Sequence, residues 1–483
     1  MTVNWFVTAL SVLFILNIFL AFALIFLERK DPASTWAWLM VLVLVPYLGF
    51  ILYLTLGRNL SREKMFNTKT EEDVIIRKIM MEQVSYLQSN EIDFNDEEMI
   101  NYQDMIRMQL ISDDSIFTQD NEVEIFTDGK EKFEALLDSI ENAKHHIHML
   151  YYIIKNDSLS RKVIAALTKK AKEGVEVRLL YDALGGRTLR KSFFKELTKA
   201  GGKVASFFPS KIPLINLRIN YRNHRKLAII DGKCGFIGGF NIGNEYIGLS
   251  KKFGYWRDTH LRIKGSAVLM MQTRFFLDWR HTTKEKNTFN EKYYPVINSN
   301  GKTGIQIVSS GPDSEQEQIK IGYLKMINSA RESIYIQTPY FVPDQSILEA
   351  LKIASLSGVD VRIMIPNKPD HMFVYWATYS YIGELLDFGV KAYTYENGFI
   401  HAKTIVVDGK ISSVGTANID VRSFRLNFEV NAFIYDTKTS TRLKEIFEND
   451  LKDCNEITIE KYKKRSIIII IKESISRLLS PVL

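Results

Sequence analysis

The chain has 483 residues, of which 46% are hydrophobic and 25% are charged, and its formal net charge is +7. This composition excludes global disorder, and the length exceeds that of one ordinary domain, so we expect two or three units. The basic balance favours an anionic partner, either nucleic acid or acidic lipid, and does not choose between them.

Two long apolar runs open the chain. The first covers residues 5–27 and would form a helix of ~34 Å, enough to cross the hydrocarbon of a bilayer. The second covers residues 36–56 and carries Trp and Tyr towards its ends, as membrane spans often do. A cleaved signal peptide is the competing interpretation, but residues 1–4 contain no Lys or Arg and no small-residue cleavage site follows. We therefore predict a transmembrane hairpin in residues 1–60.

The charges that flank the two runs predict the orientation of this hairpin. In the short loop 28–35 the basic residues are offset by acidic ones, whereas the stretch after the second run is basic: Arg58, Arg62, Lys64, Lys69, Arg77 and Lys78. By the positive-inside rule, the bulk of the chain is cytoplasmic, in a multi-pass protein of the cell membrane. Residues 61–118, with helical spacing in part, are predicted to be a helical connector.

From Val123 onward the sequence alternates strand-like and helical stretches and repeats itself. The pattern Gly-Val-acid-Val-Arg, followed by two apolar residues, occurs at Gly174–Leu180 and again at Gly358–Met364. Because glycine readily caps helices, each copy indicates a helix that ends in a glycine before a strand. We predict an α/β fold of two pseudo-symmetric halves, residues 119–295 and 303–455, each a mixed sheet flanked by helices, with the active site between them.

A second repeat has the form HxKxxxxD. Its first copy contains His224, Lys226 and Asp231, and its second contains His401, Lys403 and Asp408. A glycine follows each histidine at +14 and an asparagine at +17, namely Gly238 and Asn241, then Gly415 and Asn418. Five matched positions at equal offsets indicate two copies of one catalytic unit.

The spacing within each motif predicts how its side chains are arranged. Residues i and i+2 of a strand share a face, so each histidine points the same way as the lysine that follows it. We expect Asp231 and Asp408 to fix the motif turns and the lysines, and Asn241 and Asn418 to begin the next loop or helix, where phosphate can bind.

This set of residues suits phosphodiester transfer. One histidine can attack phosphorus, the other can act as acid and base, and the lysines and asparagines can stabilise the phosphoryl oxygens, so we expect neither a metal nor a cofactor. Asp258 and Glu429, each on a strand-like run after its motif, are candidate acceptors for the second ring nitrogens. The cluster His145, His146 and His148 lacks carboxylate or Cys partners at clear ligand spacing, and we expect no metal there.

These residues match the HKD motif of the phospholipase D superfamily, within which the chain is similar to the bacterial cardiolipin synthases. The similarity extends to the hairpin, to the segment Thr338–Asp344 and to the C-terminal Arg477–Pro481. It implies that two phosphatidylglycerols become cardiolipin and glycerol, with His224 as the nucleophile and His401 as the acid and base. It also implies phosphatidylglycerol and the anionic membrane as partners, with no nucleic acid.

The resemblance also marks residues outside the motifs. The position after each motif glycine is often Ser in the superfamily, and here Gly239 and Thr416 are the candidate phosphate contacts, with Tyr340 as a candidate for the lipid pocket. A phospholipase D or a phosphatidyltransferase with another acceptor would use the same residues. An HKD nuclease and a non-catalytic membrane scaffold are the more distant alternatives.

The tail, residues 461–483, is both basic and apolar and contains five consecutive isoleucines. We favour an amphipathic helix at the membrane interface. Because isoleucine runs also suit strands, a strand that packs on the second half is the alternative.

Overall fold

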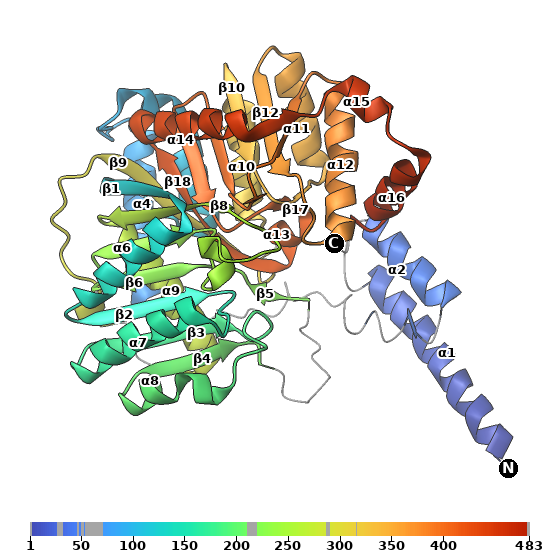
Figure 1. Cartoon of the computed structure of the whole chain (residues 1–483), viewed down its shortest axis with the longest axis horizontal. Coiled ribbons are helices and arrows are strands. Elements are labelled where there is room, and N and C mark those ends of the chain that lie inside the picture. Colours follow the sequence, from blue (N-terminus) through green and yellow to red (C-terminus); the bar gives the residue numbers. More distant parts are fainter. Residues whose placement is uncertain are drawn as a thin grey trace.

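Two mixed sheets of the same topology form the body of the molecule (Figure 1). The computed structural model describes residues 2–26, 32–45, 48–49, 53, 71–209, 220–285, 290–314 and 316–480. The first sheet has the order β4-β3-β2-β6-β7-β8-β1, in which β4, β3 and β2 are parallel and the later pairs are antiparallel. Its strands are β1 (Thr118–Asp128), β2 (His146–Tyr151), β3 (Glu176–Asp182), β4 (Lys203–Phe207), β6 (Leu227–Ile230), β7 (Cys234–Gly238) and β8 (Trp256–Lys264).

The second sheet repeats this arrangement as β13-β12-β10-β15-β16-β18-β9, again with the first three strands parallel. β1 pairs with both β8 and β9 and so joins the two sheets. The strands are β9 (Thr303–Ser310), β10 (Ser333–Gln337), β12 (Asp360–Pro366), β13 (Lys391–Tyr395), β15 (Thr404–Val407), β16 (Ile411–Gly415), β18 (Asn427–Tyr435) and, paired with β13, β19 (Cys454–Glu456). The predicted α/β fold with two repeated halves is therefore confirmed.

Four short strands lie outside this pattern. β5 (Arg222–Asn223) and β14 (Phe399–Ile400) precede the two motif histidines, and β11 (Phe341–Val342) pairs in parallel with β17 (Ile419–Asp420). β5 pairs with β18 and β14 pairs with β8, so each crosses from its own half to the other.

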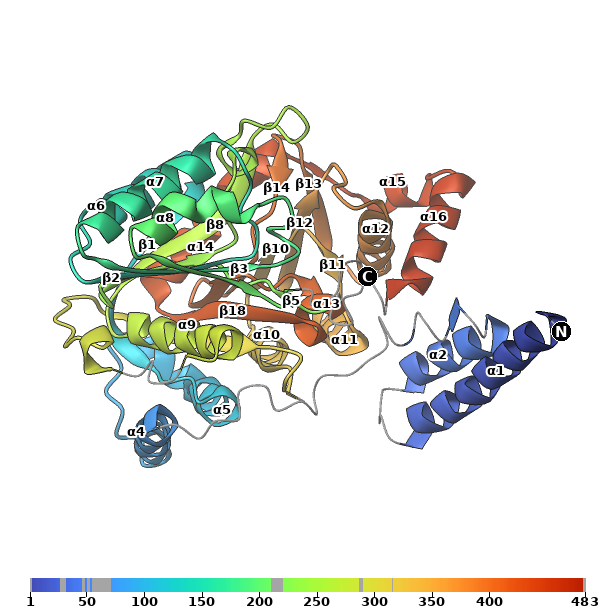
Figure 2. The same cartoon turned by 90° about the horizontal axis from the view of Figure 1, so that it is seen from below.

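Helices cover both faces of the sheets. Figure 2 shows α6, α7 and α8 on one side of the first sheet and α9 on the other, and one hydrophobic cluster joins α9 to strands of both halves. Helices α5, α10, α11 and α12 contribute to the core of the second half. The helices of the body are α4 (Glu71–Gln88), α5 (Gln103–Asp113), α6 (Gly129–Glu141), α7 (Ser158–Lys172), α8 (Lys195–Lys199), α9 (Ala267–Thr283), α10 (Gln318–Ser329), α11 (Gln345–Leu356), α12 (Met372–Leu386), α13 (Val421–Arg425) and α14 (Thr437–Asp450). The 3₁₀ turns are η2 (Glu97–Tyr102), η3 (Lys191–Phe194), η4 (Asn244–Ile247), η5 (Glu291–Tyr293) and η6 (Leu451–Asp453).

Local sequence explains the repeated turns. Gly174 and Gly358 have φ values of +90° and +93° just after α7 and α11, so they end these helices in the left-handed conformation that glycine adopts without strain. The motif strands β6 and β15 are buried along their whole length, because helices or strands cover both faces of the sheet.

The N-terminal segment forms two helices that project from the body (Figure 1), α1 (Thr2–Phe26) and α2 (Pro32–Leu44). They contact one another, and Asn17 donates a hydrogen bond to the Leu42 carbonyl at 2.6 Å. Within the part of the chain that the structure describes, no helix has both the length and the apolar character that crossing a membrane requires. Residues 27–31, most of the second predicted span after residue 45, and the flanking basic residues of 54–70 lie outside the described residues, as does Pro481 of the tail.

The tail is helical rather than a strand. It contains α15 (Ile459–Lys463) and α16 (Ile467–Leu478), and α16 packs beside α12, where Arg477 donates to the Ser380 hydroxyl at 3.4 Å. Within the predicted connector, α4, η2 and α5 are helical and pack on the second half.

The histidines at the start of β2 are buried beneath α9. His146 and His148 each lie 3.1 Å from the Gln272 side-chain oxygen, and the ring of His148 stacks on Phe275 at 4.8 Å. No group of three or more His, Cys, Asp or Glu side chains among the described residues is placed to hold a metal ion. Burial, and then the neighbouring His145, lowers the pKa of His146 to about 4.

Mild acid should therefore destabilise the fold through His146. The pKa of this histidine is lower in the folded than in the unfolded state, so the unfolded chain binds a proton more readily as the pH falls below 6.5. The stability that the neutral imidazole contributes is present in full above pH 6.5 and is lost as the pH falls towards 4. At about pH 5 the loss from this group is about 2 kcal/mol. Thermal unfolding in detergent should show a smaller difference between about pH 7.5 and pH 5 for His146→Asn than for the wild type. Equal differences would contradict the burial of a neutral imidazole.

Candidate active site

Short strand pairs that join the two halves hold both motif histidines. β5 ends directly before His224 and pairs in parallel with the start of β18, and β14 ends directly before His401 and pairs with the start of β8. The register continues by one residue, because the His224 N–H donates to the Phe428 carbonyl at 2.9 Å and the His401 N–H donates to the Arg257 carbonyl at 2.7 Å. Each histidine therefore lies beside the next residue of the opposite half.

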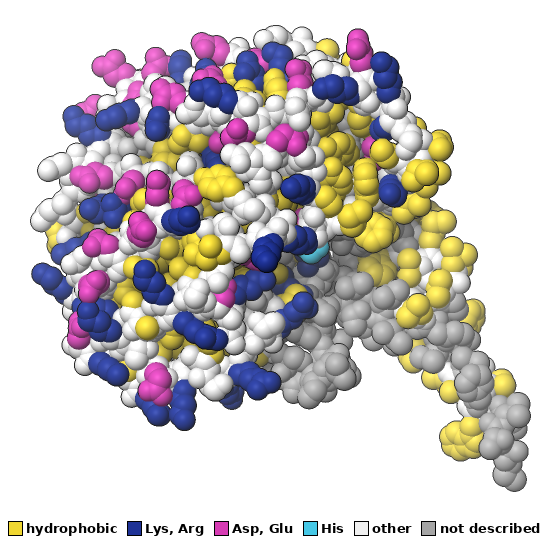
Figure 3. Space-filling model, viewed as in Figure 1, with side chains coloured by type: hydrophobic (Ala, Val, Ile, Leu, Met, Phe, Trp, Pro, Cys, Tyr) yellow, Lys and Arg dark blue, Asp and Glu magenta, His cyan; other side chains and the backbone are white. Residues whose placement is uncertain are grey.

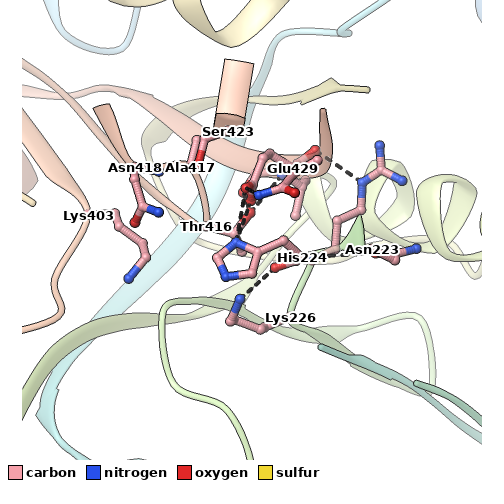
Figure 4. Close-up of polar contacts among 12 residues, drawn as sticks. Asn223, His224, Lys226, Lys403, Thr416, Ala417, Asn418, Ser423 and Glu429 are labelled. Atoms are coloured by element: carbon pink, nitrogen blue, oxygen red, sulfur yellow. Dashed lines mark hydrogen bonds and ion pairs between the residues drawn. The ribbon is translucent and has the colours of Figure 1, made fainter. Parts of the chain in front are cut away.

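These next residues are the carboxylates Glu429 and Asp258. Nδ1 of His224 lies 3.0 and 2.9 Å from the two Glu429 oxygens (Figure 4), and Nδ1 of His401 lies 2.7 Å from Oδ2 of Asp258. The sequence indicates both carboxylates as partners of histidines, and the structure shows that each serves the histidine of the other half. A carboxylate at Nδ1 holds the proton there and leaves a lone pair on Nε2.

Burial disfavours the charged form of both histidines in the free site. Burial is the largest influence on His224 and keeps its pKa below the usual value, although the charge of Glu429 opposes it. Burial and then Lys403 lower the pKa of His401 to about 4, against the opposing effect of Asp258. Burial alone would raise the pKa of each carboxylate, but the neighbouring lysine, the partner histidine and the hydrogen bonds to the carboxylate together outweigh it and lower the pKa.

The motif lysines lie beside the histidines, as the strand periodicity predicts. Nζ of Lys226 donates to the His224 carbonyl at 2.6 Å, and Nζ of Lys403 donates to the His401 carbonyl. Nζ of Lys403 also lies 2.7 Å from Nδ1 of His401, but that nitrogen has one hydrogen-bonding position, which the shared proton with Asp258 occupies. Burial lowers the pKa of Lys226 to about 7 and that of Lys403 to about 8.

The motif aspartates support the fold rather than the lysines. Each carboxylate accepts three successive backbone N–H groups at the start of the neighbouring strand, at 2.8 to 2.9 Å: Lys144, His145 and His146 for Asp231, and Arg331, Glu332 and Ser333 for Asp408. They fix the turns, as expected, with φ near +55° at both positions. Their expected contact with the lysines is wrong, because in the described structure the lysine Nζ atoms bond to the histidine carbonyls.

The positions after the motif glycines differ between the halves for a steric reason. A Cβ atom on Gly239 would lie 1.9 Å from Oδ1 of Asp258, so glycine is needed for this carboxylate to reach its place. Thr416 is buried, and its hydroxyl accepts from the Val430 N–H at 2.9 Å, directly after Glu429. Gly239 thus supplies space, and Thr416 anchors the strand that carries Glu429.

Asn241 and Asn418 lie just beyond the ends of β7 and β16. Oδ1 of Asn241 accepts from the Ile153 N–H at 3.1 Å, and Nδ2 of Asn418 donates to Asp420 at 3.2 Å. Oδ1 of Asn418 is buried and has no hydrogen-bond partner among the described residues, so it is open to a ligand hydroxyl. Figure 4 places Asn418 beside Lys403, on the side of the site that the second half provides.

Tyr340 lies near the site and is tied to an acidic residue. Its hydroxyl donates to Asp370, and burial followed by the charge of Asp370 raises its pKa well above the usual value. The charge of Asp370 also acts on Lys403.

Two aromatic contacts lack any sequence motif. The ring of Tyr152, just beyond β2, lies 4.9 Å from the ring of His224, and Lys226 Nζ lies 5.5 Å from the same tyrosine ring. Trp256 lies 5.1 Å from the ring of His401. In the sequence, the only signals for these contacts are that Tyr152 lies near the end of a strand-like run and that Trp256 lies two residues before Asp258.

The match to known families follows the two halves. The family described as "Cardiolipin synthase, PLD-like domain" matches residues 136–253 and 323–451, and the family described as "Phospholipase D-nuclease N-terminal" matches residues 15–58. The crystal structure of phosphatidylserine synthase from Haemophilus influenzae covers 79% of this chain and 100% of its own, with a TM-score of 0.59 at 14% identity, and shows that the fold is shared.

Curated relatives match along almost the entire chain. A cardiolipin synthase of Listeria monocytogenes is 57% identical over 475 residues, which are 98% of each chain. The major cardiolipin synthase of Bacillus subtilis is also 57% identical over 475 residues and 98% of each chain. The chain therefore belongs to the cardiolipin synthase family, whose phospholipase D-like domain it contains twice.

Proposed function

We propose that this chain is a phosphatidyltransferase that converts two phosphatidylglycerols into cardiolipin and glycerol. The observation that carries the proposal is the pair of carboxylate-oriented histidines that two cross-half strand contacts bring into one site. The family membership supports cardiolipin as the product, and the geometry supplies the groups that the transfer requires.

In the first step, Nε2 of His224 attacks phosphorus of the donor lipid. The new bond is P–N, and the bond that breaks joins phosphorus to the glycerol oxygen. His401 takes up a proton from solvent at Nε2 when the donor binds and gives this proton to that oxygen, and free glycerol leaves. The donor phosphodiester raises the proton affinity of His401, because its negative charge offsets the lysine charge that lowers the pKa of the free imidazole.

In the second step, the intermediate transfers its phosphatidyl group to the acceptor lipid. Nε2 of His401 takes the proton from a glycerol hydroxyl of a second phosphatidylglycerol, whose oxygen attacks phosphorus as the P–N bond breaks. Lys226 and Lys403 stabilise the phosphoryl oxygens in both steps, so the reaction needs no metal. Glu429 and Asp258 keep the Nδ1 proton in place on each ring.

Purified protein incubated with phosphatidylglycerol in detergent and EDTA should form equal amounts of cardiolipin and glycerol. His224→Ala should abolish the formation of phosphatidyl-enzyme, and His401→Ala should reduce turnover at least about hundredfold, because proton transfer is lost. Mass spectrometry of lipids, and of peptides after rapid quenching, checks both results and should place the phosphatidyl group on His224.

Other products would identify other functions. Phosphatidic acid without cardiolipin would mean that water is the acceptor and that the chain is a phospholipase D. Loss of activity in EDTA that added metal restores would contradict the metal-free mechanism, and a trapped group on His401 would reverse the two histidine roles.

We also propose that the apolar face of α12 and α16 lies on the bilayer next to the N-terminal hairpin, which anchors the enzyme as a multi-pass protein with its body in the cytoplasm. On α16, Ile467, Ile468, Ile471, Ile475 and Leu478 are exposed, and Met372 and Phe373 are exposed at the start of α12. Figure 3 shows hydrophobic side chains gathered on this side of the molecule. α12 begins two residues after Asp370, which contacts Tyr340, so lipid on this face is close to the site.

Acidic substitutions on this face should impair the use of bilayer substrate. In nanodiscs, Ile471→Glu combined with Ile475→Glu should lower, about tenfold, the ratio of activity on bilayer phosphatidylglycerol to activity on a soluble short-chain analogue, because burying a carboxylate at the interface is costly. Ile353→Glu on α11, where the side chain is 60% exposed, is the matched control. An unchanged ratio in the double variant would exclude this face as the contact with the membrane.

A further inference from the structure

The two halves carry different charges at equivalent positions beside the site. Two residues before the motif histidine, the first half has Arg222 and the second has Phe399. Four residues after the motif asparagine, the second half has Arg422 and the first has Glu245. The pseudo-two-fold arrangement therefore does not extend to these positions, and sequence alone does not show which of them meet.

Cross-half pairing brings the two arginines to the same side. β5, which contains Arg222, pairs with the start of β18, directly after the helix α13 that contains Arg422. The Arg422 guanidinium donates to the Asn220 side-chain oxygen at 3.0 Å and to the Asn220 carbonyl at 2.8 Å, two residues before Arg222. Arg222 and His224 are two residues apart on an extended segment and so share a face. We call Arg222 and Arg422 the arginine lobe.

The arginine lobe is next to the proposed nucleophile. Both guanidinium charges act on the hydroxyl of Tyr152, whose ring contacts His224 at 4.9 Å. Figure 3 shows Lys and Arg side chains gathered at the centre of the face on which Figure 1 places α13. This cationic region lies beside the apolar face from which lipid would arrive.

The equivalent lobe beside His401 is aromatic. The ring of Phe399 lies 4.9 Å from that of Trp256 and 5.1 Å from that of Phe253. The Glu245 carboxylate forms an ion pair with Nζ of Lys155 at 3.5 Å. The structure thus has one cationic and one aromatic lobe, although the catalytic residues of the two halves are nearly identical. If the site bound only the phosphate that reacts, the two lobes would not need to differ in charge.

The arginine lobe also differs from the motif lysines in that its positive charge does not depend on pH near neutrality. The pKa of Lys226 is lowered to about 7, so this lysine is only partly charged near neutral pH, whereas a guanidinium stays charged. Burial and then the charge of Arg222 lower the pKa of Arg422, as expected for two like charges near one another. An anion bound between them would relieve this repulsion.

We propose that Arg222 and Arg422 bind the phosphodiester of the acceptor phosphatidylglycerol, the phosphate that does not react. This inference rests on the proposed function and specifies how that site selects its acceptor. A guanidinium matches two oxygens of a phosphodiester, so the lobe fixes one end of the three-carbon glycerol bridge. The hydroxyl at the other end is then presented to phosphorus on His224. Its proton goes to His401, the P–N bond breaks, and the phosphate on the arginines leaves unchanged as the second phosphate of cardiolipin.

Competition between acceptors for one intermediate tests this assignment. Full-length protein in nanodiscs with phosphatidylglycerol is given labelled glycerol and labelled glycerophosphoglycerol, two soluble acceptors that differ in the presence of a phosphodiester. The wild type should transfer preferentially to glycerophosphoglycerol. In Arg422→Gln and Arg222→Gln, this preference should fall by roughly tenfold to hundredfold, the usual effect of losing a hydrogen bond to a charged group. Arg422→Lys, which keeps the charge but loses the forked geometry, should fall between the two.

Arg161→Gln, an exposed position on α7, is the matched control and should leave the preference unchanged. An equal loss of both products in the lobe variants would overturn the proposal, because the arginines would then serve the donor or the fold. Equal use of the two acceptors by the wild type would overturn it without any variant. If the wild type formed neither product, the proposed function itself would fail, and this outcome is distinct from a changed preference.

Discussion

The parallel contacts of β5 with β18 and of β14 with β8 hold the two halves together at the candidate active site. Each contact is only two residues long, yet each fixes the backbone of one motif histidine beside a carboxylate of the other half. Neither half alone contains a histidine together with its acceptor. The relative position of the two sheets, which β1 joins, therefore sets the geometry of the candidate site. A shift of one sheet against the other would separate both histidine–carboxylate pairs at once.

The ionisable groups of the site also affect one another's pKa values. Two carboxylates, two lysines and His401 are buried, and the His224 side chain is 12% exposed, in surroundings where an isolated charge would be strongly unfavourable. Lys403 and His401 keep Asp258 ionised, and Asp258 in turn opposes the effect of burial on both of them. Removal of one member leaves the others uncompensated.

Much of the fold follows from local patterns. The apolar runs Leu227–Ile230 and Thr404–Val407, the Asp-Gly turns that follow them and the glycines at 174 and 358 predict strands, turns and helix ends through short-range sterics. The motif histidines and lysines of the candidate site were also predictable, since both motif copies keep the same offsets. The pairing of Glu429 with His224 was not predictable, because it depends on the register of strands about 200 residues apart in the chain.

Other features of the site depend on space rather than on pattern. From the sequence, Gly239 stands where the superfamily often has Ser. In the structure, the Asp258 carboxylate fills the space that a side chain at this position would need. The sequence places Asp231 and Asp408 in the catalytic motif, yet their hydrogen bonds go to the backbone at the starts of β2 and β10. The arginine lobe depends on the same cross-half contacts, which bring together positions that have unlike residues in the two halves.

Double-mutant cycles on the free energy of unfolding would test the cross-half pairing without requiring activity. His224→Ala would be combined in turn with Glu429→Gln and with Asp258→Asn, and His401→Ala would be combined with the same two variants. The structure predicts coupling energies of roughly 0.5 to 3 kcal/mol for His224 with Glu429 and for His401 with Asp258, and near additivity for the other two combinations. Coupling of His224 to Asp258 and of His401 to Glu429 instead would mean that each half orients its own histidine and would contradict a site built from both halves.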